Sequence, residues 1–485
     1  MLKKFMKDSV IYAFPTFISG GLSFFLLPLY TRVLSPADYG SLDLFTIFGG
    51  LVQCVIALEV SQGVARFYSD ERDLERKVLF ASSAFWFTLI CYTVFAVLML
   101  LNTNVLAILI MGQIGMEVAF QIGIIYIWSN GLFYLIQNQF RWELRSINYA
   151  IVSLLMSFVT AGVSVWLAYV MEWGLEGLLI GMVVGSFAGT SLGIWWLRKS
   201  FRFCFNSGLL REMLIFSMPL VFSSLAVWFS IYIDRIMINH YLSIDELGLY
   251  SIGFRIAFVA GLLIIGFRGA LTPLIYTYYR EADTPRQLAL IFRLFIFLVL
   301  LVFLVLSLFA IDIVQLLTTE PFYGGSVVVV FLVPAILLTN MYIFAPGIGI
   351  AKKTHYLIWI NLLGALLNLL LNMLLIPPLG IVGAGLATLI SSMAIFAMYM
   401  ITSQKLYHVP HYWPPIAFGV FAATLMAWGL PQLPLDDIAR WALNLFALVA
   451  MAMIAVALGL IRVTELKQGI TLIKTRLLFN SAKGS

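Results

Sequence analysis

Seven charged side chains of this sequence lie inside or beside long apolar runs, where charge is unusual. They are Arg32, Asp43, Glu59, Asp234, Arg235, Arg255 and Arg268. Arginines placed in this way can hold an anion through several donors, and carboxylates can exchange a proton or bind a cation. An ionisable side chain at the centre of a bilayer costs ~2.5–3.5 kcal/mol on insertion scales, so it normally faces a polar cavity or a partner.

The elements that must position these charges are long apolar segments. The chain has 485 residues, of which 62% are hydrophobic and 11% charged, with a mean hydropathy of +1.01, whereas soluble domains contain about 25% charged residues. Apolar runs near 20 residues cross ~30 Å of hydrocarbon as helices. The sequence therefore predicts an all-α polytopic membrane protein with about 14 transmembrane helices. The expected spans cover residues 9–31, 41–60, 79–101, 116–138, 148–170, 175–197, 213–239, 248–272, 289–311, 325–347, 356–376, 380–402, 412–430 and 441–461. The longest polar stretches are an expected loop at 61–78 and the tail after 462.

Lysine and arginine indicate the orientation of these spans. With the N-terminus inside, the cytoplasmic segments hold all but five of the 29 basic residues, as the positive-inside rule requires. The exceptions are Arg32, Arg235, Arg255, Arg268 and Arg440. We therefore expect both termini in the cytoplasm. The net charge of +6 is a topology signal and not evidence for a nucleic-acid partner, because that partner would need a soluble face.

Two weak internal matches organise the chain. The stretch LSPADYGSL at 34–42 resembles LSIDELGLY at 242–250, and GLEGLLIG at 174–181 resembles GIVGAGLA at 380–387. Nearly equal offsets predict two parallel six-helix repeats, and in such proteins the substrate site lies between the repeats. We expect an N-terminal lobe at 1–205, a C-terminal lobe at 206–405 and two appended spans at 406–462. An amphipathic basic tail at 463–485 would lie on the cytoplasmic membrane surface as an anchor, with partner binding as the alternative.

Signatures of enzymes and metal sites are missing from the sequence. It contains no GxxxxGK[ST] loop and no HExxH or CxxC pattern. We expect no catalytic residue, no metal and no cofactor. An enzyme such as a membrane glycan polymerase or ligase stays an alternative, although no long outer loop is expected to house its site.

Each candidate residue also has a purely structural interpretation. Arg32 and Asp43 lie near the expected outer interface, where snorkelling explains a charge, and Glu59 and Arg268 lie near inner span ends. Arg255 lies about two turns inside its span, which favours a cavity role. Two leading hairpins with such charges would make a cationic cavity between the halves.

Two further groups of polar residues are candidates for the substrate site: one adjacent charged pair and three asparagines at helical spacing. Asp234 and Arg235 are neighbours, which point in different directions on a helix, so each needs a partner elsewhere. Asn361, Asn368 and Asn372 share one face of the eleventh span. Asparagine can hydrogen-bond a sugar hydroxyl, but interhelical packing uses the same residue.

Three stretches resemble a known family. They are LLPLYTRVLSPADYGSLDLF at 26–45, FSMPLVFSSLAVWFSIYIDRIMINHYLSIDELGLYSIGFRIA at 216–257 and LLNLLLNMLLIPPLGIVGAGLATLIS at 366–391. They are similar to bacterial polysaccharide exporters of the multidrug/oligosaccharidyl-lipid/polysaccharide (MOP) superfamily, in particular to Wzx-type flippases of lipid-linked oligosaccharides. The resemblance covers roughly residues 5–405.

This resemblance implies a V-shaped two-lobed bundle in the bacterial cytoplasmic (inner) membrane that works by alternating access. The implied substrate is an undecaprenyl-pyrophosphate-linked glycan, moved from the cytoplasmic to the outer leaflet for O-antigen, capsule or exopolysaccharide synthesis. Membrane lipids, a polysaccharide polymerase and export machinery are the implied partners. The family's cavity arginines match Arg32, Arg255 and Arg268 here, and Arg235 is a further candidate for contact with the pyrophosphate. Asp43, Glu59 and Asp234 are candidates for coupling to a proton or sodium gradient, because a carboxylate can exchange a proton or bind a cation.

Two transporter alternatives stay open. A cation-coupled, MATE-like multidrug exporter of the same superfamily would need an acidic, aromatic cavity, whereas arginines are at least as numerous as acids in the leading hairpins. A lipid II flippase for cell-wall synthesis is closer in chemistry, but the stretches quoted above are not its signatures.

Overall fold

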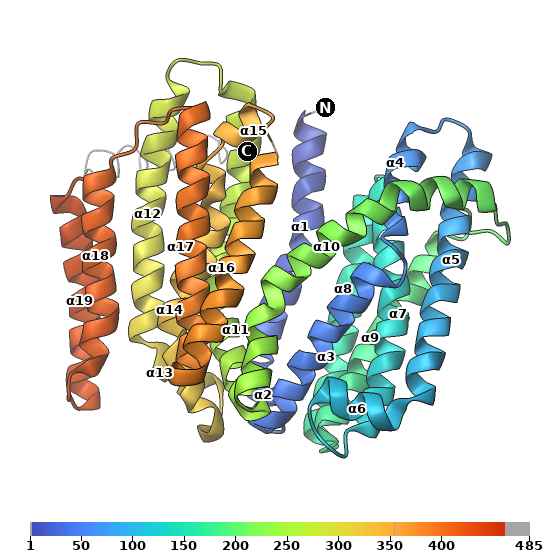
Figure 1. The fold of residues 1–485 in the computed structure, drawn as a ribbon, viewed down its shortest axis with the longest axis horizontal. Coiled ribbons are helices and arrows are strands. Elements are labelled where there is room, and N and C mark those ends of the chain that lie inside the picture. Colours follow the sequence, from blue (N-terminus) through green and yellow to red (C-terminus); the bar gives the residue numbers. More distant parts are fainter. Residues whose placement is uncertain (1, 354, 461–485) are drawn as a thin grey trace, which may run out of the picture. The chain divides into compact units, whose positions relative to one another are not determined.

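The structure is a computed structural model that describes residues 2–353 and 355–460, without the side chains of residues 2–10, 13, 265, 266, 268–270, 272–274, 276 and 277. The tail expected at 463–485 lies outside the described residues. Helices make up the fold, and the described part contains no strand (Figure 1). The first ten helical elements are α1 (Leu2–Phe25), α2 (Leu27–Tyr30), α3 (Pro36–Val55), α4 (Val60–Asp70), α5 (Leu74–Leu101), α6 (Thr103–Met111), α7 (Glu117–Trp142), α8 (Ser146–Ser164), the π-helix η1 (Val165–Val170) and α9 (Gly174–Trp196). They are followed by α10 (Ser207–Tyr241), α11 (Ile244–Tyr278), α12 (Thr284–Leu308), α13 (Ala310–Leu317), η2 (Glu320–Val328), α14 (Val329–Asn340), η3 (Met341–Phe344), α15 (Gly347–Ile350), α16 (His355–Leu379), α17 (Ile381–Leu406), α18 (Trp413–Gly429), η4 (Leu430–Gln432) and α19 (Asp437–Ala457).

The prediction of an all-helical polytopic membrane protein is confirmed. Twelve helical segments of the described residues are long and apolar enough to cross a membrane, and the pair α3 and α4 would make a thirteenth. The first expected span corresponds to α1 and α2, whose apolar part, Phe14–Tyr30, is shorter. Helices α10 and α11 have 35 residues each and extend beyond the expected spans.

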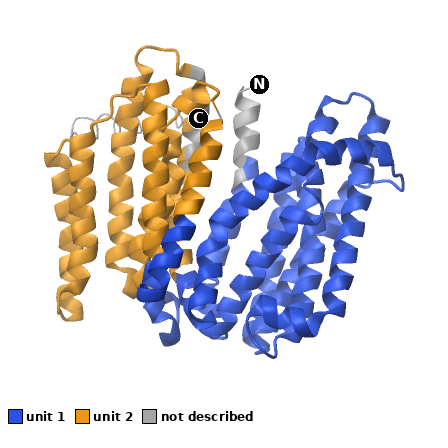
Figure 2. Ribbon diagram, viewed as in Figure 1, with its two compact units in different colours: residues 1–252, 314–325, 368–384 blue, residues 253–313, 326–367, 385–485 orange. Residues whose placement is uncertain are grey.

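The chain divides into two compact units (Figure 2). Unit 1 contains residues 1–252, 314–325 and 368–384, and unit 2 contains residues 253–313, 326–367 and 385–485. The boundary expected at 205/206 separates two stretches of similar sequence, whereas these units are defined by contacts in space. The repeat boundary therefore stays a prediction. Within unit 2, α12 packs against α14, α18 and α19.

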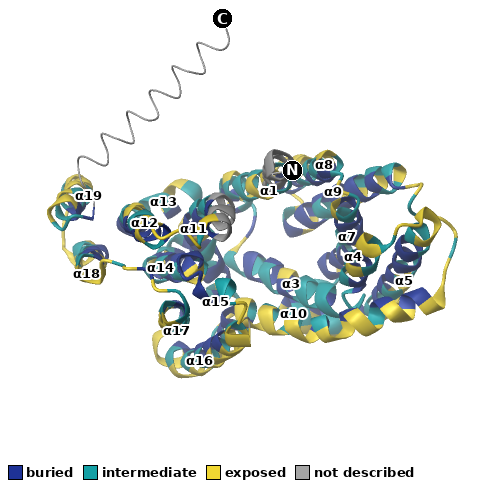
Figure 3. Ribbon diagram, turned by 90° about the horizontal axis from the view of Figure 1, so that it is seen from above, coloured by how far each residue is buried: buried dark blue, intermediate teal, exposed yellow. Residues whose placement is uncertain are grey.

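Unit 1 is organised around the closely packed helices α7, α8 and α9. Glycines recur every fourth residue along α9, at positions 177, 181, 185, 189 and 193. A Cβ atom at Gly181 would lie 2.5 Å from the backbone nitrogen of Ser164, and one at Gly185 would lie 2.8 Å from the carbonyl oxygen of Met156. Small residues at this spacing let helix backbones approach closely in membranes. By contrast, α10 is exposed along most of its apolar stretch (Figure 3), as expected of a surface that contacts lipid.

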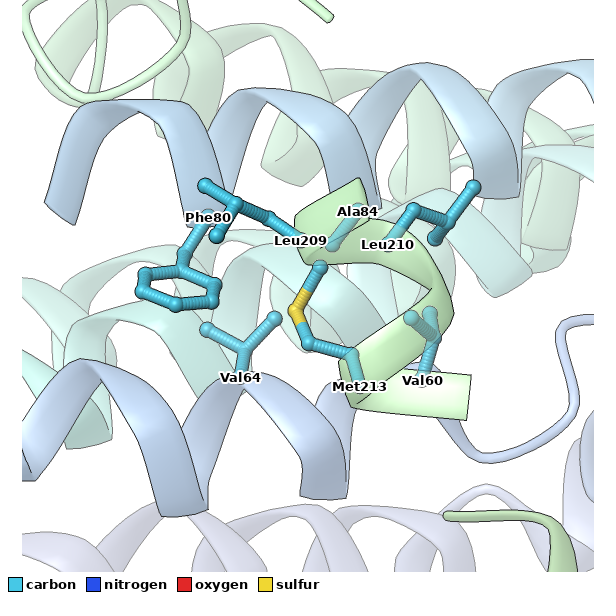
Figure 4. Close-up of a cluster of buried hydrophobic side chains, with 7 residues drawn as sticks. All are labelled: Val60, Val64, Phe80, Ala84, Leu209, Leu210 and Met213. Carbon is cyan, nitrogen blue, oxygen red and sulfur yellow. The ribbon is translucent and has the colours of Figure 1, made fainter. Parts of the chain in front are cut away.

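The expected polar loop at 61–78 is wrong in its first part, because Val60–Asp70 forms the helix α4. The axis bends by 44° between α3 and α4. Helix α4 is amphipathic, and its apolar face joins a buried cluster with α5 and the start of α10 (Figure 4). The cluster contains Val60, Val64, Phe80, Ala84, Leu209, Leu210 and Met213. Burial of these side chains keeps α4 folded although its other face is polar.

Candidate functional site

The two similar stretches at 34–42 and 242–250 contact each other at equivalent positions. A Cβ atom at Gly40 would overlap the carbonyl oxygen of Ile244, and one at Gly248 would overlap the carbonyl oxygen of Pro36. Each glycine therefore allows the start of one helix, α3 or α11, to touch the backbone of the other. This double contact fixes the register of the polar residues that follow in both helices.

A buried ion pair joins α3 to α10 one turn further along. Arg235 Nε lies 2.8 Å from Asp43 Oδ2, and the two side chains are 7% and 18% exposed. Ser251 Oγ donates a hydrogen bond of 2.7 Å to the same carboxylate oxygen, across an offset of 208 residues. The guanidinium carbon of Arg235 also lies 5.6 Å from the ring centre of Tyr232, within range of a cation–π interaction. Asp43 therefore balances the charge of Arg235 inside unit 1.

The neighbouring Asp234 belongs to a second buried network. Tyr250 OH donates to Asp234 Oδ2 over 3.1 Å, and Asn372 Nδ2 donates to Asp234 Oδ1 over 2.8 Å. Asn372 Nδ2 also lies 2.9 Å from the backbone oxygen of Asn368 and 3.1 Å from its Oδ1. All of these residues are buried. Asp234 and Arg235 thus have separate partners on other helices, as their adjacency in the sequence predicts.

The remaining charged candidates and Asn361 differ in exposure. Arg32 is exposed just before α3, and Arg255 is half-buried on the part of α11 that belongs to unit 2. Asn361 is exposed, and its Nδ2 donates to Tyr399 OH over 3.3 Å. The side chain of Arg268 lies outside the described residues. The cationic cavity expected between the halves stays a prediction.

Unit 1 also contains a cavity of about 430 Å³ between α1, α3, α7 and α8. Its volume falls in the usual range of small-molecule sites. Nine lining residues carry a hydroxyl or an amide, and none is charged: Thr16, Ser19, Gln53, Asn130, Tyr134, Gln137, Tyr149, Ser153 and Ser157. Pro15, Phe133 and Met156 complete the lining. The cavity is therefore polar and electrically neutral.

Some of these groups bind each other and others do not. Gln137 Nε2 donates to Ser153 Oγ over 2.7 Å, and the hydroxyls of Ser19 and Ser157 lie 2.6 Å apart. The amides of Gln53 and Asn130 make no hydrogen bond to another described side chain or backbone group, which leaves them available to a ligand.

Sequence reasoning missed this neutral cavity. Asn130, Tyr134 and Gln137 are spaced by four and three residues, and Ser153 and Ser157 by four, the spacing that puts side chains on one helix face. This spacing is a sequence signal for a polar helix face, although it carries no charge. Groups of three or more His, Cys, Asp or Glu side chains close enough to hold a metal ion do not occur among the described residues.

Comparison with solved structures defines the fold, which this chain shares with several membrane transporters. The structure is similar to the lipid II flippase MurJ in an inward closed conformation, with a TM-score of 0.68 and 13% identity, covering 92% of this chain and 99% of that one. It is also similar to an inward-facing MATE multidrug resistance transporter, with a TM-score of 0.60 and 17% identity over 79% of this chain and 95% of that one. A MOP transporter from Pyrococcus furiosus, described as having a binding pocket of reverse polarity, gives a TM-score of 0.56 and 15% identity over 83% of this chain and 96% of that one.

The sequence itself identifies the family. A profile described as polysaccharide biosynthesis protein matches residues 29–324, more than half of the chain. This chain belongs to that polysaccharide biosynthesis family. A Haemophilus influenzae protein named for the Lsg locus is 24% identical over 306 residues, which cover 61% of this chain and 72% of that protein. The resemblance noted in the sequence is thereby confirmed.

Proposed function

We propose that this protein is a flippase that moves lipid-linked oligosaccharide units from the cytoplasmic to the outer leaflet of a bacterial inner membrane. The neutral polar cavity of unit 1 is the observation that supports this function best. Sugar hydroxyls are neutral donors and acceptors, and the cavity offers hydroxyls and amides of the same kind. The aromatic rings of Phe133, Tyr134 and Tyr149 add apolar surface for the faces of sugar rings. A cationic drug would instead favour a carboxylate in this cavity.

The anionic end of the proposed substrate needs a different environment. An undecaprenyl pyrophosphate is negatively charged, and arginine is well suited to bind phosphate oxygens. We assign this task to Arg255, with Arg32 and Arg268 as further contacts, while the lipid tail stays in the bilayer. Arg235 is a weaker choice, because Asp43 already balances its charge. A proton or sodium gradient would drive alternating access, and a polysaccharide polymerase would receive the product.

Reconstitution tests the proposal directly. Proteoliposomes containing a fluorescent undecaprenyl-pyrophosphate oligosaccharide are treated with a membrane-impermeant quencher, and the protected fraction is followed over time. Wild-type protein is expected to make the inner-leaflet lipid accessible. The variant Gln137→Leu removes a cavity amide and is expected to slow this step about 2- to 10-fold, the value of one hydrogen bond.

A matched variant on the same helix provides the control. Gln121 of α7 is exposed and does not line the cavity, so Gln121→Leu is expected to flip lipid at the wild-type rate. Equal rates for both variants would contradict the role of the cavity. Transport of cationic drugs without movement of the glycan lipid would favour the multidrug exporter instead.

Arg255 is tested separately. Arg255→Ala is expected to abolish glycan export while the protein is still produced and inserted, whereas Arg255→Lys is expected to retain part of the activity. Normal export by Arg255→Ala would contradict the assignment of the pyrophosphate to this residue.

A further inference from the structure

Arg141, near the end of α7, has no opposing charge among the described residues. It is exposed and lies between the expected spans 116–138 and 148–170, on the side expected to face the cytoplasm. No described carboxylate forms an ion pair with Arg141. The nearby Arg145 differs, because its Nη1 lies 3.2 Å from Oε2 of Glu143. The guanidinium of Arg141 is therefore an accessible cation whose charge the described part of the protein does not balance.

Tyr149 connects this cation to the neutral polar cavity of unit 1. Its side chain is buried and lines the cavity, and the ring of Tyr12 packs edge-on against it at 5.2 Å between ring centres. Arg141 Nη2 donates to Tyr149 OH over 2.7 Å. The guanidinium carbon lies 4.7 Å from the centre of the Tyr149 ring, within range of a cation–π interaction. One side chain thus contacts both the cation and the cavity.

Both residues keep hydrogen-bond donors for a ligand. The bond from Arg141 uses a lone pair of the Tyr149 hydroxyl oxygen, so the hydroxyl hydrogen is left to donate, and the adjacent positive charge strengthens it as a donor. Of the five N–H groups of an arginine, Arg141 uses one on Tyr149 and one on Asn138 Oδ1, over 3.3 Å. The others have no hydrogen-bond partner among the described residues.

This combination fits a ligand that is anionic in one part and neutral in the adjoining part. The planar guanidinium matches the oxygens of a phosphate group, and the hydroxyls and amides of the cavity match the hydroxyls of a sugar. A sugar phosphate joins the two parts by one bond. A glycerophospholipid such as phosphatidylglycerol offers the phosphate but has no sugar ring for the cavity.

We propose that Arg141 and Tyr149 bind the sugar-proximal phosphate of the lipid-linked cargo, with the first sugar in the neutral cavity. Arg141 holds the phosphate oxygens through its fork, and Tyr149 donates to an oxygen of the same phosphate. The inference rests on the proposed function and adds a contact within unit 1 to the arginines assigned there. Because that cargo starts in the cytoplasmic leaflet, the contact is made when the cargo enters.

Binding is measured on the purified full-length protein in nanodiscs of phosphatidylcholine. Two fluorescent probes carry the same oligosaccharide, one linked to undecaprenol through pyrophosphate and one linked directly. Wild-type protein is expected to prefer the pyrophosphate probe. Arg141→Gln replaces the cation by a neutral amide and is expected to reduce this preference about 10-fold or more, the value of a hydrogen bond to a charged group. Tyr149→Phe keeps the ring and is expected to reduce the preference about 2- to 10-fold.

Arg198 provides a matched control. It is exposed just after α9, and its guanidinium carbon lies 5.6 Å from the ring centre of Trp195, but neither residue lines the neutral cavity. Arg198→Gln is therefore expected to keep the wild-type preference. Arg141→Lys keeps the charge without the planar fork and is expected to retain part of the preference.

Three outcomes would overturn the inference. In the first, Arg141→Gln keeps the wild-type preference, which excludes a contact with the phosphate. In the second, Arg141→Gln loses affinity equally for both probes and has a lower melting temperature, which indicates that Arg141 only supports the position of Tyr149. In the third, phosphatidylglycerol displaces the pyrophosphate probe as well as the unlabelled pyrophosphate lipid does, which indicates a general phospholipid site.

Failure of the proposed function would give a different result. Wild-type protein that prefers the pyrophosphate probe through Arg141, but never moves it across the membrane of a proteoliposome, would contradict the flippase and leave this binding site intact. Normal flipping by the wild type, with no effect of Arg141→Gln on binding, would contradict this binding site and leave the flippase intact.

Discussion

Two polar regions of unit 1 differ in what their side chains do. In the ion pair of Asp43 and Arg235 and the network around Asp234, polar atoms on four helices are bound to one another. In the neutral cavity, the amides of Gln53 and Asn130 face open space instead. In the first region the charged side chains are matched to partners within unit 1, and in the second two uncharged amides are left available. The charges of Asp43, Asp234 and Arg235 therefore hold helices together, while the uncharged polar face of the cavity is the better candidate for contact with a sugar.

The largest effect is expected from breaking the buried ion pair. Asp43→Asn leaves the charge of Arg235 without its carboxylate, and removal of one member of a buried pair costs about 3–5 kcal/mol. We expect a large fall in melting temperature and in the yield of monodisperse protein, measured by fluorescence-detected size exclusion after heating. The double variant Asp43→Asn with Arg235→Met is expected to recover much of the loss, because no unpaired charge remains.

An exposed pair of the same chemistry provides the control. Arg66 and Asp70 form an ion pair on the surface of α4, and such pairs contribute about 0.2–1 kcal/mol. Asp70→Asn should therefore melt close to the wild type. If Asp43→Asn is no less stable than Asp70→Asn, the buried pair has no architectural role.

A smaller loss is expected from the network around Asp234. Asn372→Ala removes a donor to a buried carboxylate, and an unsatisfied buried group costs about 1–3 kcal/mol. The melting temperature in detergent should fall, while Asn361→Ala, at an exposed position of the same helix α16, should change it little. Equal melting temperatures for the two variants would place Asn372 outside the stabilising network.

In the neutral cavity, a substitution should change the flipping rate and leave the stability of the protein nearly unchanged. Asn130→Ala removes an amide that has no partner among the described residues, so the free energy of unfolding should change by less than about 0.5 kcal/mol. Flipping measured in proteoliposomes should nevertheless slow. A variant that loses stability but retains its flipping rate would show that this cavity is architectural, like the ion pair.

A separate effect, seen only at low pH, concerns a half-buried imidazole in the loop between α17 and α18. The ring of His411 lies between Phe292 and Trp413, and burial, together with the nearby His408, lowers the pKa of His411 to about 4. Below pH 6.5 the unfolded chain binds a proton that the folded chain resists, so stability should fall as the pH decreases from about 6.5 to 4. Melting temperatures across this range should fall less for His411→Phe, and parallel pH profiles for the two proteins would exclude this histidine as the cause.

The spans could be predicted from the sequence because hydropathy over about 20 residues is a local property. The partners of the buried charges could not. Asp43 and Arg235 are brought together by a contact between α3 and α10 that no local pattern encodes. The bend at Leu58 and Glu59 could not be predicted either. The serines that hydrogen-bond to it, Ser217 and Ser224, lie about 160 residues further along the chain on α10. Asn130, Tyr134 and Gln137 are a different case, since their spacing did indicate a polar helix face.

The paired contacts of Gly40 and Gly248 have a consequence for the origin of the chain. In a two-fold symmetric interface, one surface meets a copy of itself, so every contact occurs twice with its partners exchanged. Gly40 against Ile244 and Gly248 against Pro36 have this form within a single polypeptide. The start of α3 and the start of α11 are therefore arranged like the two sides of a homodimer. Duplication and fusion of a gene for a self-associating half-length ancestor would leave this arrangement, with the mutual contact of the glycines retained after most of the sequence had diverged.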